Sequence, residues 1–178
     1  MRCSEQLVNI SNWTLDEKIK DRINGSGFEH LNNISTCRHH ARLLESIASR
    51  FDAEKCIFQF DNFHLLFGLK DVLYITGLHI TGKPVTGIDD DPITWSQKCF
   101  GENLCMRKNN KLLGSIRLDV LKAKFMNVPD DASDEVLDRH ARAYVCYMLG
   151  SSLFSTSAHD YVPTMYSLCP KINDMFDH

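Results

Sequence analysis

The fold is decided by one stretch of the sequence, which reads Ala143-Tyr144-Val145-Cys146-Tyr147-Met148-Leu149. All seven residues are apolar or aromatic, so a helix formed by them is apolar on every face and has to be buried. Candidate N-cap residues precede it at Asp130 to Asp134, and the small residues Gly150-Ser151-Ser152 that follow allow close packing. We therefore predict a central buried helix from Glu135 to about Phe154.

Length and composition indicate a single core around this helix. The chain has 178 residues, of which 43% are hydrophobic and 24% are charged. These values are ordinary for a globular protein and allow one buried core. The formal net charge of −3 argues against a protein that binds polyanions through a summed basic field. We predict a flexible N-terminal segment at 1–13 and one compact domain at 14–178.

The first third of the sequence predicts three helices. Thr14 stands three residues before Glu17, which is the spacing of a capping box at a helix start. A short helix is expected at Phe28 to Asn33 and a longer one at Arg38 to Phe51. The longer one carries apolar residues at steps of three and four, which predicts a buried stripe made of Ala41, Leu44, Ile47 and Phe51.

The pattern then changes to short runs of aromatic and branched residues. Cys56 to Phe60 and Phe63 to Phe67 are separated by the turn-forming pair Asp61-Asn62, which predicts a β-hairpin. Leu69 to Thr76 follows as one or two helical turns, and Gly77 is a natural left-handed C-cap. After it, Gly82 to Gly87 contains a Pro between glycines and predicts a rigid loop or an edge strand.

The remaining elements are expected to be mostly helical. Asp89-Asp90-Asp91-Pro92 predicts a helix start, with Trp95 anchoring that helix to the core. A loop is expected at Gly101 to Asn110 and a helix at Ile116 to Phe125. A final loop and short helix are expected at Tyr161 to Ile172. The predicted fold class is mainly α with a small β-hairpin, in a single compact helical domain.

The cysteines and the hydropathy pattern indicate an intracellular protein. Met1 to Thr14 lacks the continuous apolar stretch of a signal peptide. The longest apolar run, Ala143 to Leu149, is far shorter than the roughly 20 residues that cross a bilayer. An odd number of widely spaced cysteines predicts reduced thiols; they are Cys3, Cys37, Cys56, Cys99, Cys105, Cys146 and Cys169.

Neither metal binding nor catalysis is indicated. Cys37, His39 and His40 with Cys56 lack the second ligand pair of a local zinc motif. His140 and Cys146 on one helix would lie about 9 Å apart along its axis, too far for a nucleophile and its base. We therefore expect no catalytic residues, no cofactor, no metal and no small-molecule substrate.

Two ordered segments carry a resemblance to a known family. The first comprises Phe63 to Val72, Thr76-Gly77-Leu78 and Gly82 to Gly87. The second comprises Arg142 to Phe154 and Asp160-Tyr161-Val162-Pro163. Together they resemble the plant mobile domain. The similarity covers most of the chain from about Phe28 and corresponds to the N-terminal half of the family's domain, so an apolar surface is expected to lie open.

The resemblance implies a setting for the protein. The family includes the Maintenance of Meristems proteins and also occurs within transposable elements. It implies nuclear localisation, a role in meristem maintenance, genome stability and transposon silencing, and a phosphatase-like nuclear partner. The family is also labelled aminotransferase-like, but pyridoxal phosphate chemistry needs a Schiff-base Lys beside a phosphate-binding loop, and the sequence does not show that combination.

The leading hypothesis is a non-catalytic protein-interaction module. Arg142 begins an otherwise apolar helix segment and needs a carboxylate, for which Asp71 and Asp138 are the two alternatives. The candidate interaction or structural residues are Asp71, Gly82, Lys83, Pro84, Val85, Gly87, Arg142 and Tyr144.

Two alternatives to this hypothesis stay open. A basic run can contact nucleic-acid phosphates, or it can simply form a solvated helix face. The other alternative is a transposon-derived remnant without function. The basic run consists of Arg107, Lys108, Lys111, Arg117, Lys122 and Lys124.

Overall fold

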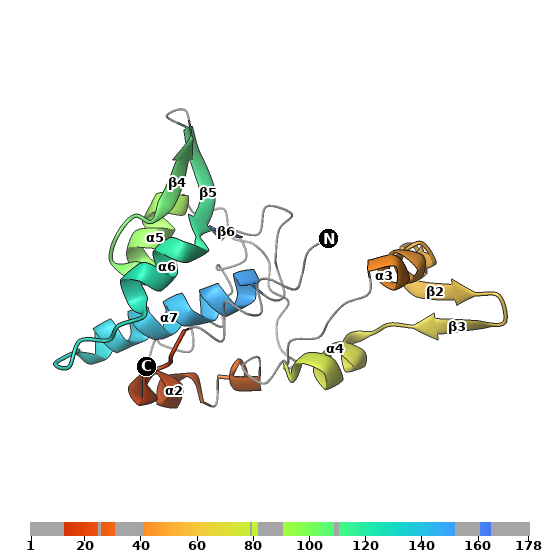
Figure 1. Cartoon of the computed structure of the whole chain (residues 1–178), viewed down its shortest axis with the longest axis horizontal. Coiled ribbons are helices and arrows are strands. Elements are labelled where there is room, and N and C mark those ends of the chain that lie inside the picture. The colour runs from red at the N-terminus through yellow and green to blue at the C-terminus, as the bar shows by residue number, and fades with distance from the viewer. Residues whose placement is uncertain are drawn as a thin grey trace.

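The structure is a computed structural model, and its elements fall into two groups that lie apart from each other (Figure 1). One group surrounds a long central helix, and the other forms a projecting arm of helices and strands. The residues that the structure describes are 13–24, 26–30, 41–78, 80–81, 91–108, 111–151 and 161–164.

The central helix, α7, confirms the helix predicted from the apolar stretch. It spans Asp134–Ser151, and no residue from Ala143 to Leu149 is more than 4% exposed. Three helices pack against it: α2 (Glu17–Ile23), α5 (Pro92–Phe100) and α6 (Leu118–Phe125). A segment that is apolar on all sides is stable in water only when neighbours surround it, and these helices provide that cover.

The start of α2 differs from the prediction. Its N-cap is Asp16 and not Thr14, and the Asp16 carboxylate accepts a hydrogen bond from the backbone N–H of Lys18 at 2.8 Å. Asp16 is as good an N-cap residue as a hydroxyl residue. The helix is held to α7 by Arg22, which forms ion pairs with Asp134 at 2.5 Å and with Asp138.

A second sheet stands where a loop and a helix were predicted. The strands β4 (Cys105–Lys108), β5 (Lys111–Arg117) and β6 (Tyr161–Pro163) form an antiparallel sheet in the order β4-β5-β6. The loop predicted at Gly101 to Asn110 and the helix predicted at Ile116 are therefore wrong in part, because α6 begins only at Leu118. The loop and short helix predicted at Tyr161 to Ile172 begin instead with the strand β6, and the residues after Thr164 lie outside the described part of the chain.

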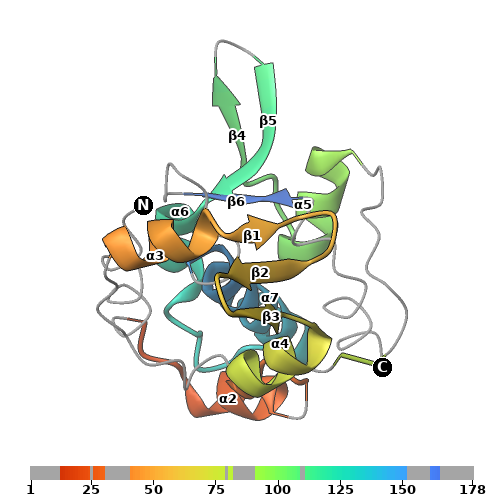
Figure 2. The ribbon, with the colours of Figure 1, turned by 90° about the vertical axis from the view of Figure 1, so that its right-hand side faces the viewer.

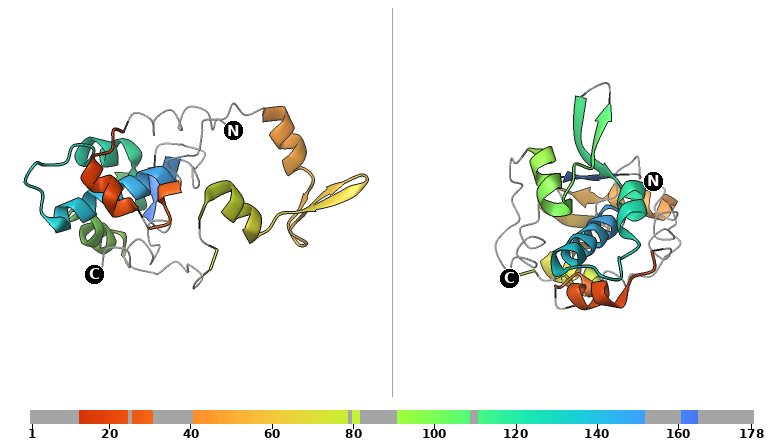
Figure 3. Two further views of the ribbon diagram at one scale, coloured as in Figure 1. Left: turned by 90° about the horizontal axis from the view of Figure 1, so that it is seen from below. Right: turned by 90° about the vertical axis from the view of Figure 1, so that its left-hand side faces the viewer.

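The arm contains α3 (Ala41–Ala48), β1 (Phe51–Asp52), β2 (Ile57–Phe60), β3 (Phe63–Leu66) and α4 (Leu69–Thr76). The predicted hairpin is confirmed as β2 and β3, and β1 adds a third antiparallel strand, in the order β1-β2-β3. The predicted C-cap is also confirmed, since Gly77 has φ 71°. Figure 2 looks at the arm from its outer end, and Figure 3 shows it beside α7 from below.

The fold class is therefore mixed α/β, and the prediction of a mainly helical protein with one hairpin is wrong. The described residues contain two three-stranded antiparallel sheets. Nor are the elements gathered around α7 alone, because the arm lies to one side of that core (Figure 1). The missed sheet combines a local strand pair, β4 with β5, and a pair that is distant in sequence, since Ile116 of β5 pairs with Val162 of β6.

Candidate interaction surface

Exposed apolar side chains are concentrated on the arm. We define the apolar arm as residues 41–78. Every exposed large hydrophobic residue found in the described part of the chain belongs to it: Leu43, Leu44, Phe51, Phe63, Leu65, Leu66, Phe67, Leu69, Tyr74 and Ile75. Such a concentration of exposed apolar side chains is unusual on a protein that works alone, and it commonly marks a site of interaction.

One face of the arm's sheet is aromatic. Phe51 lies opposite Phe58 with ring centroids 4.9 Å apart, and Phe60 stacks on Phe63 with centroids 4.7 Å apart. Leu65 lies opposite Phe58 on the same face. Side chains alternate between the two faces of a strand, so these five residues share one face and form a continuous apolar strip across all three strands.

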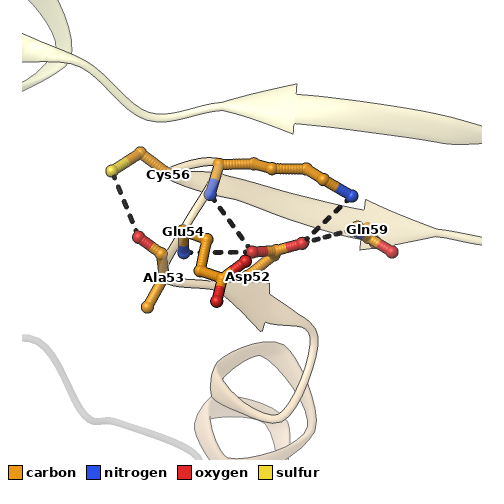
Figure 4. Close-up of polar contacts among 6 residues, drawn as sticks. Asp52, Ala53, Glu54, Cys56 and Gln59 are labelled. Carbon is orange, nitrogen blue, oxygen red and sulfur yellow. Dashed lines mark hydrogen bonds and ion pairs between the residues drawn. The ribbon is translucent and has the colours of Figure 1, made fainter.

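The opposite face of the sheet is more polar and is organised by Asp52 (Figure 4). The Asp52 carboxylate accepts hydrogen bonds from the backbone N–H groups of Glu54 and Lys55, both at 3.1 Å, and from the side-chain amide of Gln59 at 2.8 Å. The pKa of the Asp52 carboxyl is lowered, and the main cause is the hydrogen bond from the backbone N–H of Lys55. These bonds close the turn from β1 to β2, in which Cys56 has φ 55°.

The helices of the arm also expose apolar residues. On α4, Tyr74 is 83% exposed and Ile75 is 67% exposed. On α3, the predicted buried stripe is wrong, since Leu44 is 43% exposed and Phe51 lies in β1 and is also 43% exposed. The periodicity of this helix identified an apolar face correctly but not what that face would contact.

The predicted residues Asp71, Arg142 and Tyr144 lie in two different parts of the molecule. Asp71 belongs to α4 in the arm, where its carboxylate accepts a hydrogen bond from the backbone N–H of Gly68 at 2.8 Å. Arg142 is half-buried on α7, whereas Asp71 lies on α4 of the arm. The alternative partner of Arg142, Asp138, forms an ion pair with Arg22 of α2.

Tyr144 is a core residue. Its side chain is 4% exposed and packs edge-on against Trp13, with ring centroids 5.3 Å apart. Burial raises the pKa of Tyr144 to about 12, so its hydroxyl stays protonated at neutral pH. The predicted loop residues fall outside the described part of the chain; they are Gly82, Lys83, Pro84, Val85 and Gly87.

The basic run is divided between a hairpin and a helix. Arg107, Lys108 and Lys111 lie on β4 and β5, and Lys108 pairs directly with Lys111 across the two strands.

The other three basic residues lie at or on α6. Arg117 precedes the helix, and its Nε donates to Asp119 at 2.9 Å. Lys124 forms an ion pair with Glu102, while Lys122 is half-buried. Local carboxylates thus offset two of these three charges.

The titratable side chains that the sequence analysis considered for metal binding and catalysis lie in varied surroundings. Within the part of the chain that the structure describes, no three His, Cys, Asp or Glu side chains converge on a point that could hold a metal ion. His140 is buried, with Nδ1 2.8 Å from the carbonyl oxygen of Phe125. Burial raises the pKa of the Cys105 thiol, which disfavours the reactive thiolate. None of the described helices is both long enough and apolar enough to span a bilayer.

Fold and surface together define a class: a small mixed α/β domain that displays apolar side chains on a projecting arm. The chain belongs to the family described as "Domain of unknown function (DUF8566)", whose model matches residues 1–175. No solved structure is significantly similar to the chain.

Curated relatives confirm the resemblance to the plant mobile domain family. The chain is 32% identical to Protein MAIN-LIKE 2 of Arabidopsis thaliana over 93% of its own length and 25% of the relative's. It is 27% identical to Protein MAINTENANCE OF MERISTEMS of the same plant, over 88% of this chain and 33% of that protein. The chain thus spans a quarter to a third of the length of these two relatives.

A further relative has a different name. Serine/threonine-protein phosphatase 7 long form homolog, also of Arabidopsis thaliana, is 26% identical over 94% of this chain and 12% of its own length. The similar region is therefore a small part of that larger protein.

Proposed function

We propose that the chain is a non-catalytic protein-interaction module of a nuclear protein, and that it binds its partner through the apolar arm. The observation that carries this proposal is that, among the residues that the structure describes, the exposed large hydrophobic side chains all lie within 41–78. The relatives named for meristem maintenance support a role in that process. Functions in genome stability and transposon silencing are part of the same proposal.

The chemistry of the arm suits binding by apolar burial. Aromatic side chains contribute strongly to protein interfaces, because they bury a large area at a small cost in conformational entropy. Phe51, Phe63 and Tyr74 are each at least 43% exposed and supply such area. Arg50 lies over the ring of Phe60, 5.5 Å from its centroid, and places a cation at the border of the aromatic face.

The partner that we propose is a phosphatase-like nuclear protein. The support is the family resemblance, together with the finding that a similar region occurs in a protein named as a phosphatase homologue. An apolar surface that stays exposed in the free chain would be covered in such a complex. The free energy gained would scale with the apolar area buried, at roughly 25 cal/mol per Å² before the costs of association.

Affinity purification from plant nuclei tests the proposal. A double variant with Tyr74→Lys and Ile75→Lys adds two charges to the arm at residues that are 83% and 67% exposed. The matched control carries Gln97→Lys and Asn127→Lys, two exposed positions in the core group. We expect the wild type and the control to recover the same phosphatase-like protein and the arm variant to lose it. Equal recovery by all three proteins would show that α4 is not part of the contact.

A second candidate function is nucleic-acid binding by the β4–β5 hairpin, which projects from the core group (Figure 1). The observation in its favour is the cross-strand pairing of Lys108 with Lys111, next to Arg107. If these residues contact phosphates, changing all three to Ala would reduce the salt dependence of duplex DNA binding by roughly one unit of slope per residue. Lys98→Ala, an exposed change on α5, is the control.

A further inference from the structure

The strand β3 forms an open edge of the arm's sheet in the part of the chain that the structure describes. Its register with β2 pairs Gln59 with His64. The backbone N–H of Gln59 donates to the carbonyl of Arg50 at 2.9 Å, on the β1 side, so Gln59 does not exchange backbone hydrogen bonds with His64. By the alternation of an antiparallel ladder, the backbone groups of His64 and Leu66 point away from β2.

Within the part of the chain that the structure describes, this edge lacks the usual protection against pairing with another strand. All four residues of β3 are exposed, and the strand contains no Pro, no Gly, no Lys and no carboxylate. Natural edge strands are commonly protected by such residues or by a covering element. In β3, Leu65 is 52% exposed and Leu66 is 71% exposed, so both sides of the strand are apolar and open.

Two copies of β3 can pair in an antiparallel arrangement that is centred on Leu65, so that Leu65 of one copy lies opposite Leu65 of the other. In that arrangement Phe63 lies opposite Phe67 of a second copy, and His64 lies opposite Leu66. The outward-pointing groups of His64 and Leu66 would then exchange four backbone hydrogen bonds across a two-fold axis. Leu65 would face its own counterpart in a close pair without hydrogen bonds, with Cα atoms about 4.5 Å apart.

The charges that flank β3 favour the same antiparallel arrangement. Asp61 precedes the strand, with its side chain 90% exposed, and Lys70 follows it in an exposed position. Reversal about Leu65 brings the Asp61 end of one copy beside the Lys70 end of the other. A parallel arrangement would instead bring each of these charges beside its own copy, which is unfavourable.

We propose that a second copy of this chain docks on the open edge of β3, so that the two arms share one six-stranded antiparallel sheet. Each copy contributes the aromatic face that holds Phe60 and Phe63, and the two faces become continuous across the axis. The pairing extends beyond the proposed function, because it can form whether or not the arm also binds a nuclear partner. It also covers part of the apolar surface that the single chain exposes.

Sedimentation equilibrium of the purified chain at micromolar concentrations tests the dimer. We expect the wild type to be dimeric. Leu65→Lys places two like charges together at the axis and should raise the dimer dissociation constant at least roughly tenfold. Tyr74→Lys, which adds the same charge on α4, should leave the dimer intact. A monomeric wild type, or a dimer that persists in Leu65→Lys, would overturn the proposal.

A mixing experiment tests the two-fold axis itself. Leu65→Lys and Leu65→Glu should each be monomeric alone, and an equimolar mixture should form a one-to-one dimer, because opposite charges then meet at the axis. Both variants should remain folded, as judged by circular dichroism, since Leu65 is already 52% exposed in the single chain. Failure of the mixture to dimerise would exclude this register. The nuclear purification with the α4 variant is scored independently, so either proposal can fail alone.

Discussion

Gly150 lies directly against Val162: a Cβ atom added to Gly150 would come 2.8 Å from the Cβ of Val162. It would also come 2.9 Å from Cδ2 of Leu118. The end of α7 and the strand β6 therefore approach each other at a distance that only glycine permits. This contact joins the second sheet to the central helix, and it gives a physical reason for the small residue that follows the apolar stretch.

Gly150→Ala should destabilise the protein by about 1–2 kcal/mol, because the cost of overpacking exceeds the gain in helix propensity. Gly68→Ala is the matched control. The nearest atom to a Cβ at Gly68 is 3.9 Å away, and its φ is −128°, which any residue adopts. Chemical denaturation measures both changes. Equal effects of the two substitutions would show that the packing against Val162 is not tight.

The sequence predicted the elements whose signals are local. α7 follows from seven consecutive apolar residues, and the β2–β3 hairpin follows from the turn pair Asp61-Asn62 between two short strands. The strand β6 was missed because its Val162 pairs with Ile116, far along the chain, and a single-sequence pattern does not identify distant partners. The pair β4–β5 is local, with Cys105 opposite Ile116, but β4 lies in the stretch Gly101 to Asn110 that was predicted to be a loop.

The candidate surface was only partly predictable for a related reason. The residues from Phe63 to Phe67 were correctly predicted to form a strand, but their exposure depends on which elements lie nearby. One signal was present in the sequence: Leu65, Leu66 and Phe67 are apolar in succession, so both sides of the strand are apolar. A strand with only one buried side normally alternates apolar and polar residues. This departure from alternation marked a strand with apolar side chains on both faces.

Trp13 connects the segment before α2 to the central helix. Its ring packs edge-on against Tyr144 and Tyr147, with centroids 5.3 Å and 4.9 Å away, and it is 5% exposed. Trp13→Ala should lower the free energy of unfolding by about 3 kcal/mol or more, because it removes a buried aromatic group and leaves a cavity. Trp13→Phe should cost clearly less. Urea denaturation compares the two, and a loss below about 1 kcal/mol for the Ala variant would contradict the packing.

Ser96 closes the turn that leads from α5 to β4. Its side chain is completely buried, and its hydroxyl donates to the carbonyl of Glu102 and accepts from the backbone N–H of Leu104, both at 2.9 Å. Ser96→Ala leaves both backbone groups without this partner and should cost about 1–3 kcal/mol. Ser49→Ala removes an exposed hydroxyl that bonds to the carbonyl of Ser46, and it should change stability by less than about 0.5 kcal/mol. Thermal melts of both variants are the measurement.

Because of Asp52, the stability of the arm should decrease at low pH. Its folded-state pKa is lowered from 3.8, chiefly by the hydrogen bond from the backbone N–H of Lys55. A lowered pKa means that the stabilisation is complete above the unfolded value and is lost as the pH falls through the folded value, which lies below 3.8. Asp52→Asn keeps an acceptor oxygen for the turn but removes the charge. The measurement is hydrogen exchange of the backbone amides of Ile57 to Leu66 between about pH 5 and pH 2. As the pH falls, these amides should lose less protection in the Asp52→Asn variant than in the wild type. Identical acid profiles for the two proteins would show that the Asp52 carboxylate does not stabilise the turn between β1 and β2.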